Sequence, residues 1–166
     1  MVRPSYIFMD FDGVTHPWGE VEDFRSLPLI EAVVREFEEV RIIISSDWRM
    51  LFSLPKLRQR FSEDIRHRIV GVTPHILPRR GNELHGLREH EAMLWLQQHE
   101  PDRDDVAWCA LDDAPGNWTT RSRLLLTDFK RGFTSEDAEA LRRMLQVFRE
   151  GIPVLEKPRM AYRWAS

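Results

Sequence analysis

The stretch YIFMDFDGVTHPWG, residues 6–19, joins an apolar run to two carboxylates one residue apart. The apolar run Tyr6–Met9 is predicted to be a buried β-strand, and Asp10 and Asp12 follow it directly. Because alternate residues of an extended chain face the same way, both carboxylates are expected to point to one side at the end of this strand. Gly13 is expected to permit the tight turn that comes next.

The rest of the chain alternates short apolar runs with amphipathic stretches, which is the pattern of βα units around a parallel sheet. Four further strands are predicted at Val40–Ile44, Arg68–Val72, Val106–Leu111 and Arg123–Thr127. Helical spacing of apolar residues predicts helices over Leu29–Phe37, over Leu51–Phe61, from Arg88 to the stop at Pro101, and after the capping box Thr134–Asp137. In the second of these stretches, Pro55 either kinks the helix or starts a new turn after Ser53. We therefore expect a three-layer α/β/α fold with a central, mostly parallel five-stranded sheet.

Length and composition suit one globular domain. The chain has 166 residues, 42% of them hydrophobic and 31% charged, with a formal net charge of −3. These values do not fit a disordered chain or a strongly basic nucleic-acid binder. No repeat or linker divides the sequence, so we expect a single domain over residues 1–150 and a tail over residues 151–166.

The single cysteine and the lack of long apolar runs bear on localisation. Cys109 lies inside a predicted strand, which makes a buried core position the expected one and excludes an intramolecular disulfide. No secretory leader and no run of 18 apolar residues is found. We expect a cytoplasmic protein with no membrane segment.

A second pair of carboxylates, Asp112 and Asp113, follows the fourth predicted strand. Ligand sites of open α/β sheets lie at the carboxyl ends of the strands, so these side chains are expected to meet Asp10 and Asp12 there. Four clustered acids repel one another unless a cation or raised pKa values relieve the repulsion. All-oxygen ligands suit Mg²⁺, which is the cofactor we expect.

A hydroxyl and a cation complete the predicted site. Ser45 directly follows the second strand, where its hydroxyl can donate to a phosphoryl oxygen, and Ser46 is the alternative if the register differs by one. Arg88 begins the helix before the fourth strand, where a cation can balance a transferring phosphoryl group, although it can equally pair with Glu89 or Glu91.

The order of these motifs resembles the haloacid dehalogenase (HAD) superfamily of aspartate-nucleophile phosphohydrolases. FMDFDGV is similar to the first motif of the superfamily, IIIS ending at Ser45 to the second, and WCALDD to the fourth. A narrower resemblance rests on SSDWR, GVTP, REHEAMLWL and GFT, which look like the small HAD domain of Swiss Army Knife RNA repair proteins. The resemblance covers roughly Tyr6 to Phe148.

The resemblance implies a Rossmannoid fold and an aspartyl-phosphate mechanism. Asp10 would attack phosphorus, and Asp12 would protonate the leaving oxygen and later activate water. Mg²⁺ would be held by the Asp10 carboxylate, the Asp12 backbone carbonyl and one of Asp112 or Asp113, with the choice between these two left open.

The resemblance also implies phosphoryl contacts from Ser45 and Arg88. The segment His75–Leu87 looks longer than the usual link in the family, which leaves Arg80 as a rival to Arg88. The other candidate substrate-binding residues are Gly13, Ser46 and Arg49. Trp48 and Arg49 could contact a base or sugar, or could simply pack the start of a helix.

Neither link after the first two motifs is long enough for the separate cap domain found in some superfamily members. An open site suits a nucleic-acid end or another phosphorylated molecule covered by a partner, and RNA-repair enzymes are possible partners. The alternatives are a phosphatase or phosphotransferase for small metabolites, and a non-catalytic domain that binds phosphate or a partner.

Overall fold

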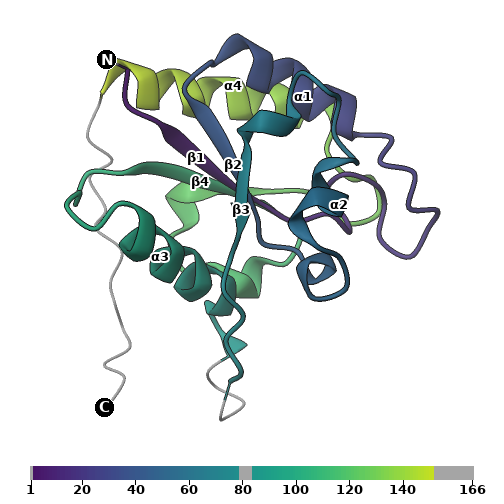
Figure 1. Cartoon of the computed structure of the whole chain (residues 1–166). Helices are drawn as coiled ribbons and strands as arrows, with labels where there is room; N and C mark the ends of the chain where they lie inside the picture. Colours follow the sequence, from purple (N-terminus) through teal and green to yellow (C-terminus); the bar gives the residue numbers. More distant parts are fainter. Residues whose placement is uncertain (1, 79–83, 152–166) are drawn as a thin grey trace.

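One parallel sheet of five strands forms the centre of the molecule in a computed structural model, which describes residues 2–78 and 84–151 (Figure 1). The strands lie in the order β3-β2-β1-β4-β5, and every neighbouring pair is parallel. Their bounds are Ser5–Met9 for β1, Val40–Ile44 for β2, Ile69–Val72 for β3, Ala107–Asp112 for β4 and Leu124–Leu126 for β5. The predicted five-stranded sheet is confirmed.

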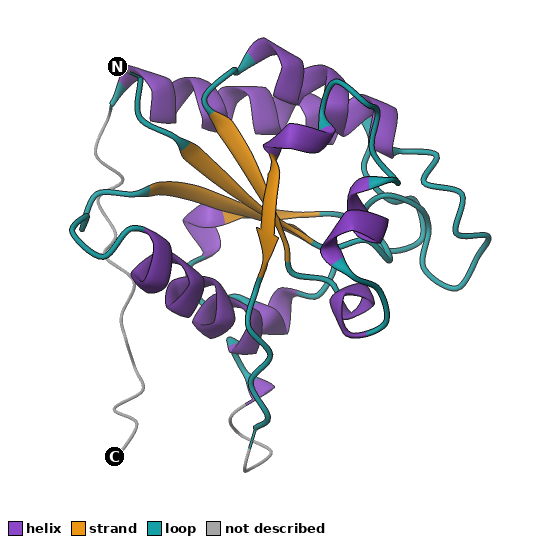
Figure 2. Ribbon diagram, viewed as in Figure 1, coloured by secondary structure: helices purple, strands orange, loops and turns teal. Residues whose placement is uncertain are grey.

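Helices cover both faces of the sheet, which gives the three layers (Figure 2). Helices α1, Leu27–Glu36, and α4, Ser135–Glu150, lie side by side on one face, and α3, Leu87–His99, lies on the other. Because β1 and β2 have a helix layer on both sides, both sets of alternating side chains are apolar and the strands read as unbroken hydrophobic runs.

The two faces of β1 separate the core into two clusters. Ile7 and Met9 pack with the side chains of α1 and α4, whereas Tyr6 and Phe8 pack with Trp95 of α3. Cys109 is fully buried in the first of these clusters, as predicted.

The capping signals explain where the helices begin. Thr134 and Asp137 form the predicted capping box at the start of α4. For the stretch Leu51–Phe61, the alternative in which Pro55 starts a new turn after Ser53 is confirmed: a 3₁₀ turn covers Asp47–Met50, and α2 covers only Leu54–Arg58. Pro55 lies in the first turn of α2, where its missing N–H costs nothing, and so it starts a new helix instead of bending a longer one.

The connections at the carboxyl edge of the sheet are loops and short helical turns. Within the described residues, nothing between β1 and α1 or between β2 and β3 forms a separate cap domain, as expected. The tail predicted at 151–166 falls almost wholly outside the described residues. None of the described helices is both long and apolar enough to cross a membrane.

Candidate functional site

Three carboxylates meet at the carboxyl edge of the sheet, at the ends of β1 and β4. Asp10 directly follows β1, and its backbone N–H donates to the Leu111 carbonyl at 3.0 Å, which ties it to the strand that ends at Asp112. Asp10, Asp112 and Asp113 each place one carboxylate oxygen within 4.8 Å of the others. The expected convergence of carboxylates therefore occurs between neighbouring strands.

Burial raises the pKa of all three groups, and the charge of Asp112 raises those of Asp10 and Asp113 further. Burial is the larger cause of the raised pKa of Asp10, and the negative charge of Asp112 is the next. Asp112 is completely buried, and its pKa is raised for the same first reason. Burial and the charge of Asp112 raise the pKa of Asp113 to about 6. This is the environment that a divalent cation would relieve.

The loop after β4 holds Asp112 in place. One oxygen of Asp112 accepts the Ala114 backbone N–H at 2.8 Å, and the other accepts the indole N–H of Trp118 at 2.9 Å and the side-chain amide of Asn117 at 3.4 Å. Trp118 is fully buried and packs against Trp108 and Phe8, so the indole donor is itself fixed.

Asp113 packs directly on Gly13. Gly13 has φ of +74°, and a Cβ placed on it would lie 2.2 Å from Asp113 Oδ2. Both the backbone conformation and the lack of room require glycine there. The hydroxyl of Thr127, just after β5, donates to the Gly13 carbonyl at 2.7 Å and ties this turn to a third strand.

The donor set fits magnesium. Mg²⁺ prefers carboxylate oxygens and water and is commonly held by one or two carboxylates. Asp10, Asp112 and Asp113 offer such oxygens from one partly buried edge, and each has a raised pKa that a bound cation would lower.

Asp12 lies beside this cluster but has its own partners. Its Oδ1 is 2.8 Å from His16 Nε2, and its Oδ2 accepts the indole N–H of Trp48 at 2.9 Å. The side chain of Asp12 is 35% exposed, whereas that of His16 is 1% exposed. Asp12 is therefore hydrogen-bonded on its buried side, and its other side is open to solvent.

The two serines after β2 differ in their contacts. A hydrogen bond from Ser46 acts on Asp10, and the Ser46 oxygen also accepts the Trp48 backbone N–H at 3.3 Å. Ser45 is fully buried, and its hydroxyl has no partner among the described residues. Of the two serines that the sequence interpretation left open, Ser46 is the one whose side chain acts on Asp10.

Two arginines converge on the buried carboxylate of Glu91. Arg88 donates to Glu91 at 2.9 Å and to Asp47 at 2.6 Å, with 13% of its side chain exposed. Its charge also acts to lower the pKa of Asp112. The sequence interpretation left open pairing with Glu89 or Glu91, and the partner is Glu91.

Arg49 is buried beneath the loop that carries the serines. Its guanidinium donates to the carbonyls of Ser45, Ser46 and Thr73 and to Glu91, and its side chain is 2% exposed. Most of the Arg49 N–H donors are therefore bonded to the protein itself and do not face a substrate. Arg80, the rival to Arg88, lies outside the described residues.

Three side chains at the site were not among the sequence-derived candidates: His16, Trp118 and Glu91. Trp48 was considered only for substrate contact or packing, and it donates to Asp12 instead. The one available signal was proximity, because His16 follows Asp12 by four residues and Trp118 follows Asp112 by six.

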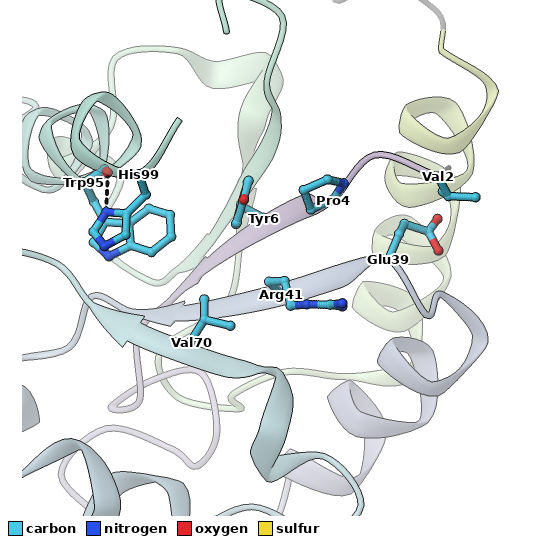
Figure 3. Close-up of a pocket in the computed structure, with 8 residues that line it drawn as sticks. All are labelled: Val2, Pro4, Tyr6, Glu39, Arg41, Val70, Trp95 and His99. Atoms are coloured by element: carbon cyan, nitrogen blue, oxygen red, sulfur yellow. Dashed lines mark hydrogen bonds between the residues drawn. The ribbon is translucent and has the colours of Figure 1, made fainter. Parts of the chain in front are cut away.

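A separate hollow of about 550 Å³ lies at the other end of the strands (Figure 3). Figure 3 shows the side chains of β1 and β2 there, with the stacked rings of Trp95 and His99 of α3. Its lining residues are Val2, Pro4, Tyr6, Glu39, Arg41, Val70, Trp95 and His99. None of the candidate site residues lines it.

The sheet order, the helices on both faces and the carboxylates at the carboxyl edge define a Rossmann-like α/β protein with an acidic centre. The family model for the HAD domain in Swiss Army Knife RNA repair proteins matches residues 6–138. The chain belongs to this family and has the HAD-type Rossmannoid fold, as the motif resemblance implied. No curated protein and no solved structure matched the chain.

Proposed function

We propose that this protein is a Mg²⁺-dependent phosphohydrolase that acts on phosphomonoesters through an aspartyl-phosphate intermediate. The observation that carries the proposal is the partly buried trio Asp10, Asp112 and Asp113, with ligand atoms within 4.8 Å of one another. Bound there, Mg²⁺ would screen the repulsion between the attacking carboxylate and the phosphoryl oxygens. The motif resemblance implies that the Asp12 backbone carbonyl is a further protein ligand, beside Asp10 and one of Asp112 or Asp113.

In the first step, a carboxylate oxygen of Asp10 forms a bond to phosphorus as the ester P–O bond breaks. Protonated Asp12 gives its proton to the leaving oxygen, so the alcohol departs neutral. In the second step, the Asp12 carboxylate takes a proton from a water molecule whose oxygen attacks phosphorus. The bond from Asp10 to phosphorus breaks, which releases inorganic phosphate and restores both side chains.

We assign the contacts to the phosphoryl oxygens to Ser46 and Arg88. The Ser46 hydroxyl acts on Asp10, the proposed nucleophile, whereas the Ser45 hydroxyl is buried and has no hydrogen-bond partner among the described residues. Arg88 keeps a partly exposed side chain near Asp112. Arg49, which the sequence interpretation placed against the substrate, is assigned to supporting the serine loop from below.

The favoured substrates are nucleotides or the terminal phosphates of nucleic acids. Support comes from membership of a family described in RNA repair proteins and from loops, not a cap domain, around the described part of the site. RNA-repair enzymes would be the corresponding partners. A phosphatase or phosphotransferase for small metabolites is the second candidate, because the same site would bind any phosphomonoester.

The test is a phosphate-release panel with nucleoside monophosphates, oligonucleotides carrying 3′ or 5′ phosphates, and sugar phosphates, with and without Mg²⁺. We expect metal-dependent release from one class, abolished by Asp10→Asn and unchanged by Asp102→Asn, which removes an exposed carboxylate elsewhere. No release from any class by folded protein would overturn the proposal and favour a non-catalytic binding domain. Transfer to an added alcohol would identify a phosphotransferase.

A further inference from the structure

The side chain of Asp12 is held by two buried N–H donors from different parts of the chain. His16 comes from the turn after β1, where the Gly13 backbone N–H donates to the His16 carbonyl at 2.9 Å and brings the ring back to Asp12. Trp48 comes from the 3₁₀ turn after β2, 36 residues away. One donor meets each carboxylate oxygen.

Hydrogen bonding around His16 indicates which ring nitrogen carries the proton. The Thr15 hydroxyl donates to the Phe11 carbonyl at 3.0 Å and lies 3.0 Å from His16 Nδ1. The other ring nitrogen, Nε2, lies 2.8 Å from Asp12 Oδ1. Because a carboxylate oxygen can only accept a hydrogen bond, the nitrogen that faces the Asp12 carboxylate, Nε2, is the one that carries a proton.

Aromatic packing fixes both donors. The Trp48 indole makes edge contacts with Phe11 at 5.7 Å and Phe24 at 5.4 Å between ring centroids, and it is 7% exposed. The His16 ring packs edge-on against Phe24 at 5.0 Å. Neither donor can turn away without disturbing this cluster, so the carboxylate of Asp12 is held in one orientation.

We propose that His16 and Trp48 are positioning residues that aim Asp12 for proton transfer to the leaving oxygen. The inference rests on the proposed function, in which Asp12 is the acid. With one lone pair of each oxygen engaged by a buried N–H, the remaining lone pairs face the exposed side, where a substrate oxygen would lie. The donors also stabilise the carboxylate that forms as the proton departs.

The kinetic test compares leaving groups. Trp48→Phe and His16→Phe keep a ring in the cluster and remove the donor, whereas His16→Gln restores an N–H. For an alkyl phosphate, whose leaving oxygen needs a proton, we expect kcat/KM to fall about 10- to 100-fold in the two Phe variants. For p-nitrophenyl phosphate, which leaves without a proton, the fall should stay within about threefold. His16→Gln should recover part of the loss.

The matched control is Trp95→Phe, which changes a buried indole on α3 whose ring packs against Tyr6 and Phe8, away from Asp12. Trp95→Phe should not lower kcat/KM for the alkyl phosphate more than for p-nitrophenyl phosphate. If kcat/KM of Trp48→Phe fell equally on both phosphates, or did not fall, the inference would be overturned. Turnover by the wild type would still support the proposed function in that case. Wild-type protein without turnover would instead remove the proposed function.

A spectroscopic measurement tests the same contacts without turnover. In ¹⁵N-labelled protein, the indole N–H signal assigned to Trp48 by its loss in Trp48→Phe should move on Asp12→Asn and stay in place on Asp102→Asn. The imidazole of His16 should carry its proton on Nε2. An unmoved indole signal, or a His16 proton on Nδ1 alone, would contradict the proposed hydrogen bonds from Trp48 and His16 to Asp12.

Discussion

The carboxylate of Asp113 occupies the space in which any side chain on Gly13 would have to lie. The Cβ position of Gly13 is 2.2 Å from Asp113 Oδ2 and 2.5 Å from its Cγ. The turn that follows the first motif and the loop that follows the fourth are thus packed against each other through a single glycine. Metal binding and the shape of this turn should therefore be coupled.

Gly13→Ala should weaken both folding and Mg²⁺ binding. The positive φ alone costs about 1–2 kcal/mol for a residue with a Cβ, and displacement of Asp113 adds to that cost. We expect a lower melting temperature and a weaker affinity for Mg²⁺, measured by thermal unfolding and by metal titration.

Gly19→Ala is the matched control, because Gly19 has φ of +75° and nothing within 4 Å of its Cβ position. It should show the conformational cost alone, with metal affinity unchanged. If both variants lost Mg²⁺ affinity equally, close packing with Asp113 would not be the cause.

Trp118→Phe should destabilise the protein through Asp112. The substitution removes the shorter of the two hydrogen bonds to Asp112 Oδ2 and leaves the one from Asn117 at 3.4 Å, and the loss of one hydrogen bond costs about 0.5–1.5 kcal/mol. Urea unfolding in EDTA measures the loss. Trp108→Phe, a change to a buried neighbouring ring that donates to no carboxylate among the described residues, should cost less. The reverse order would show that ring packing outweighs the hydrogen bond.

The sheet and its acidic edge could be predicted because each depends on local sequence. Five short apolar runs gave the five strands, and Asp10 and Asp112 were placed correctly because each lies at the end of such a run. Parallel strands bring those ends to one edge whatever the loops do. The close approach of these carboxylates is a consequence of strand order.

The contacts that depend on loop paths could not be predicted in the same way. Whether Ser45 or Ser46 faces Asp10 depends on how the chain turns after β2, which the apolar pattern does not encode. For Trp48, substrate contact and helix packing both stayed open, because the sequence does not show which group an indole N–H donates to. Arg49 is buried because Glu91, a residue in the middle of an amphipathic helix, is completely buried beneath it.

The contribution of Asp113 to the stability of the metal-free protein should fall as the pH rises from about 4 to about 6. The pKa of Asp113 is about 6 in the folded chain and about 4 when unfolded, so the folded state binds more protons in this interval. Asp10 and Asp112, with raised pKa values, add to the same trend. Melting temperatures in EDTA at several pH values measure it.

Asp113→Asn should make this pH dependence shallower, because an amide stays neutral on both sides of the interval. Asp102→Asn, at an exposed position, should leave the slope as in wild type. At pH 7, Mg²⁺ should raise the melting temperature of wild type more than that of Asp113→Asn. A slope in EDTA that was the same in Asp113→Asn as in wild type would contradict the raised pKa of Asp113.

Glu91→Gln should be strongly destabilising, because Glu91 is the carboxylate shared by two guanidinium groups. It is fully buried and accepts from Arg49 and Arg88, each at 2.9 Å, and from the Ile76 backbone N–H at 3.0 Å. The amide keeps the shape but leaves two cations without their common counter-charge, which costs about 3–5 kcal/mol for a buried pair. Urea unfolding gives the change in free energy.

The serine loop should loosen at the same time, since Arg49 holds the carbonyls of Ser45 and Ser46 only while Glu91 holds Arg49. Faster amide hydrogen exchange across residues 45–50 in Glu91→Gln would register this. Glu139→Gln, which removes an exposed partner of Arg142, should change neither quantity appreciably. If Glu91→Gln unfolded at the same urea concentration as Glu139→Gln, the two arginines would have to find their counter-charge elsewhere, in Asp47 or in the carboxylates at the sheet edge.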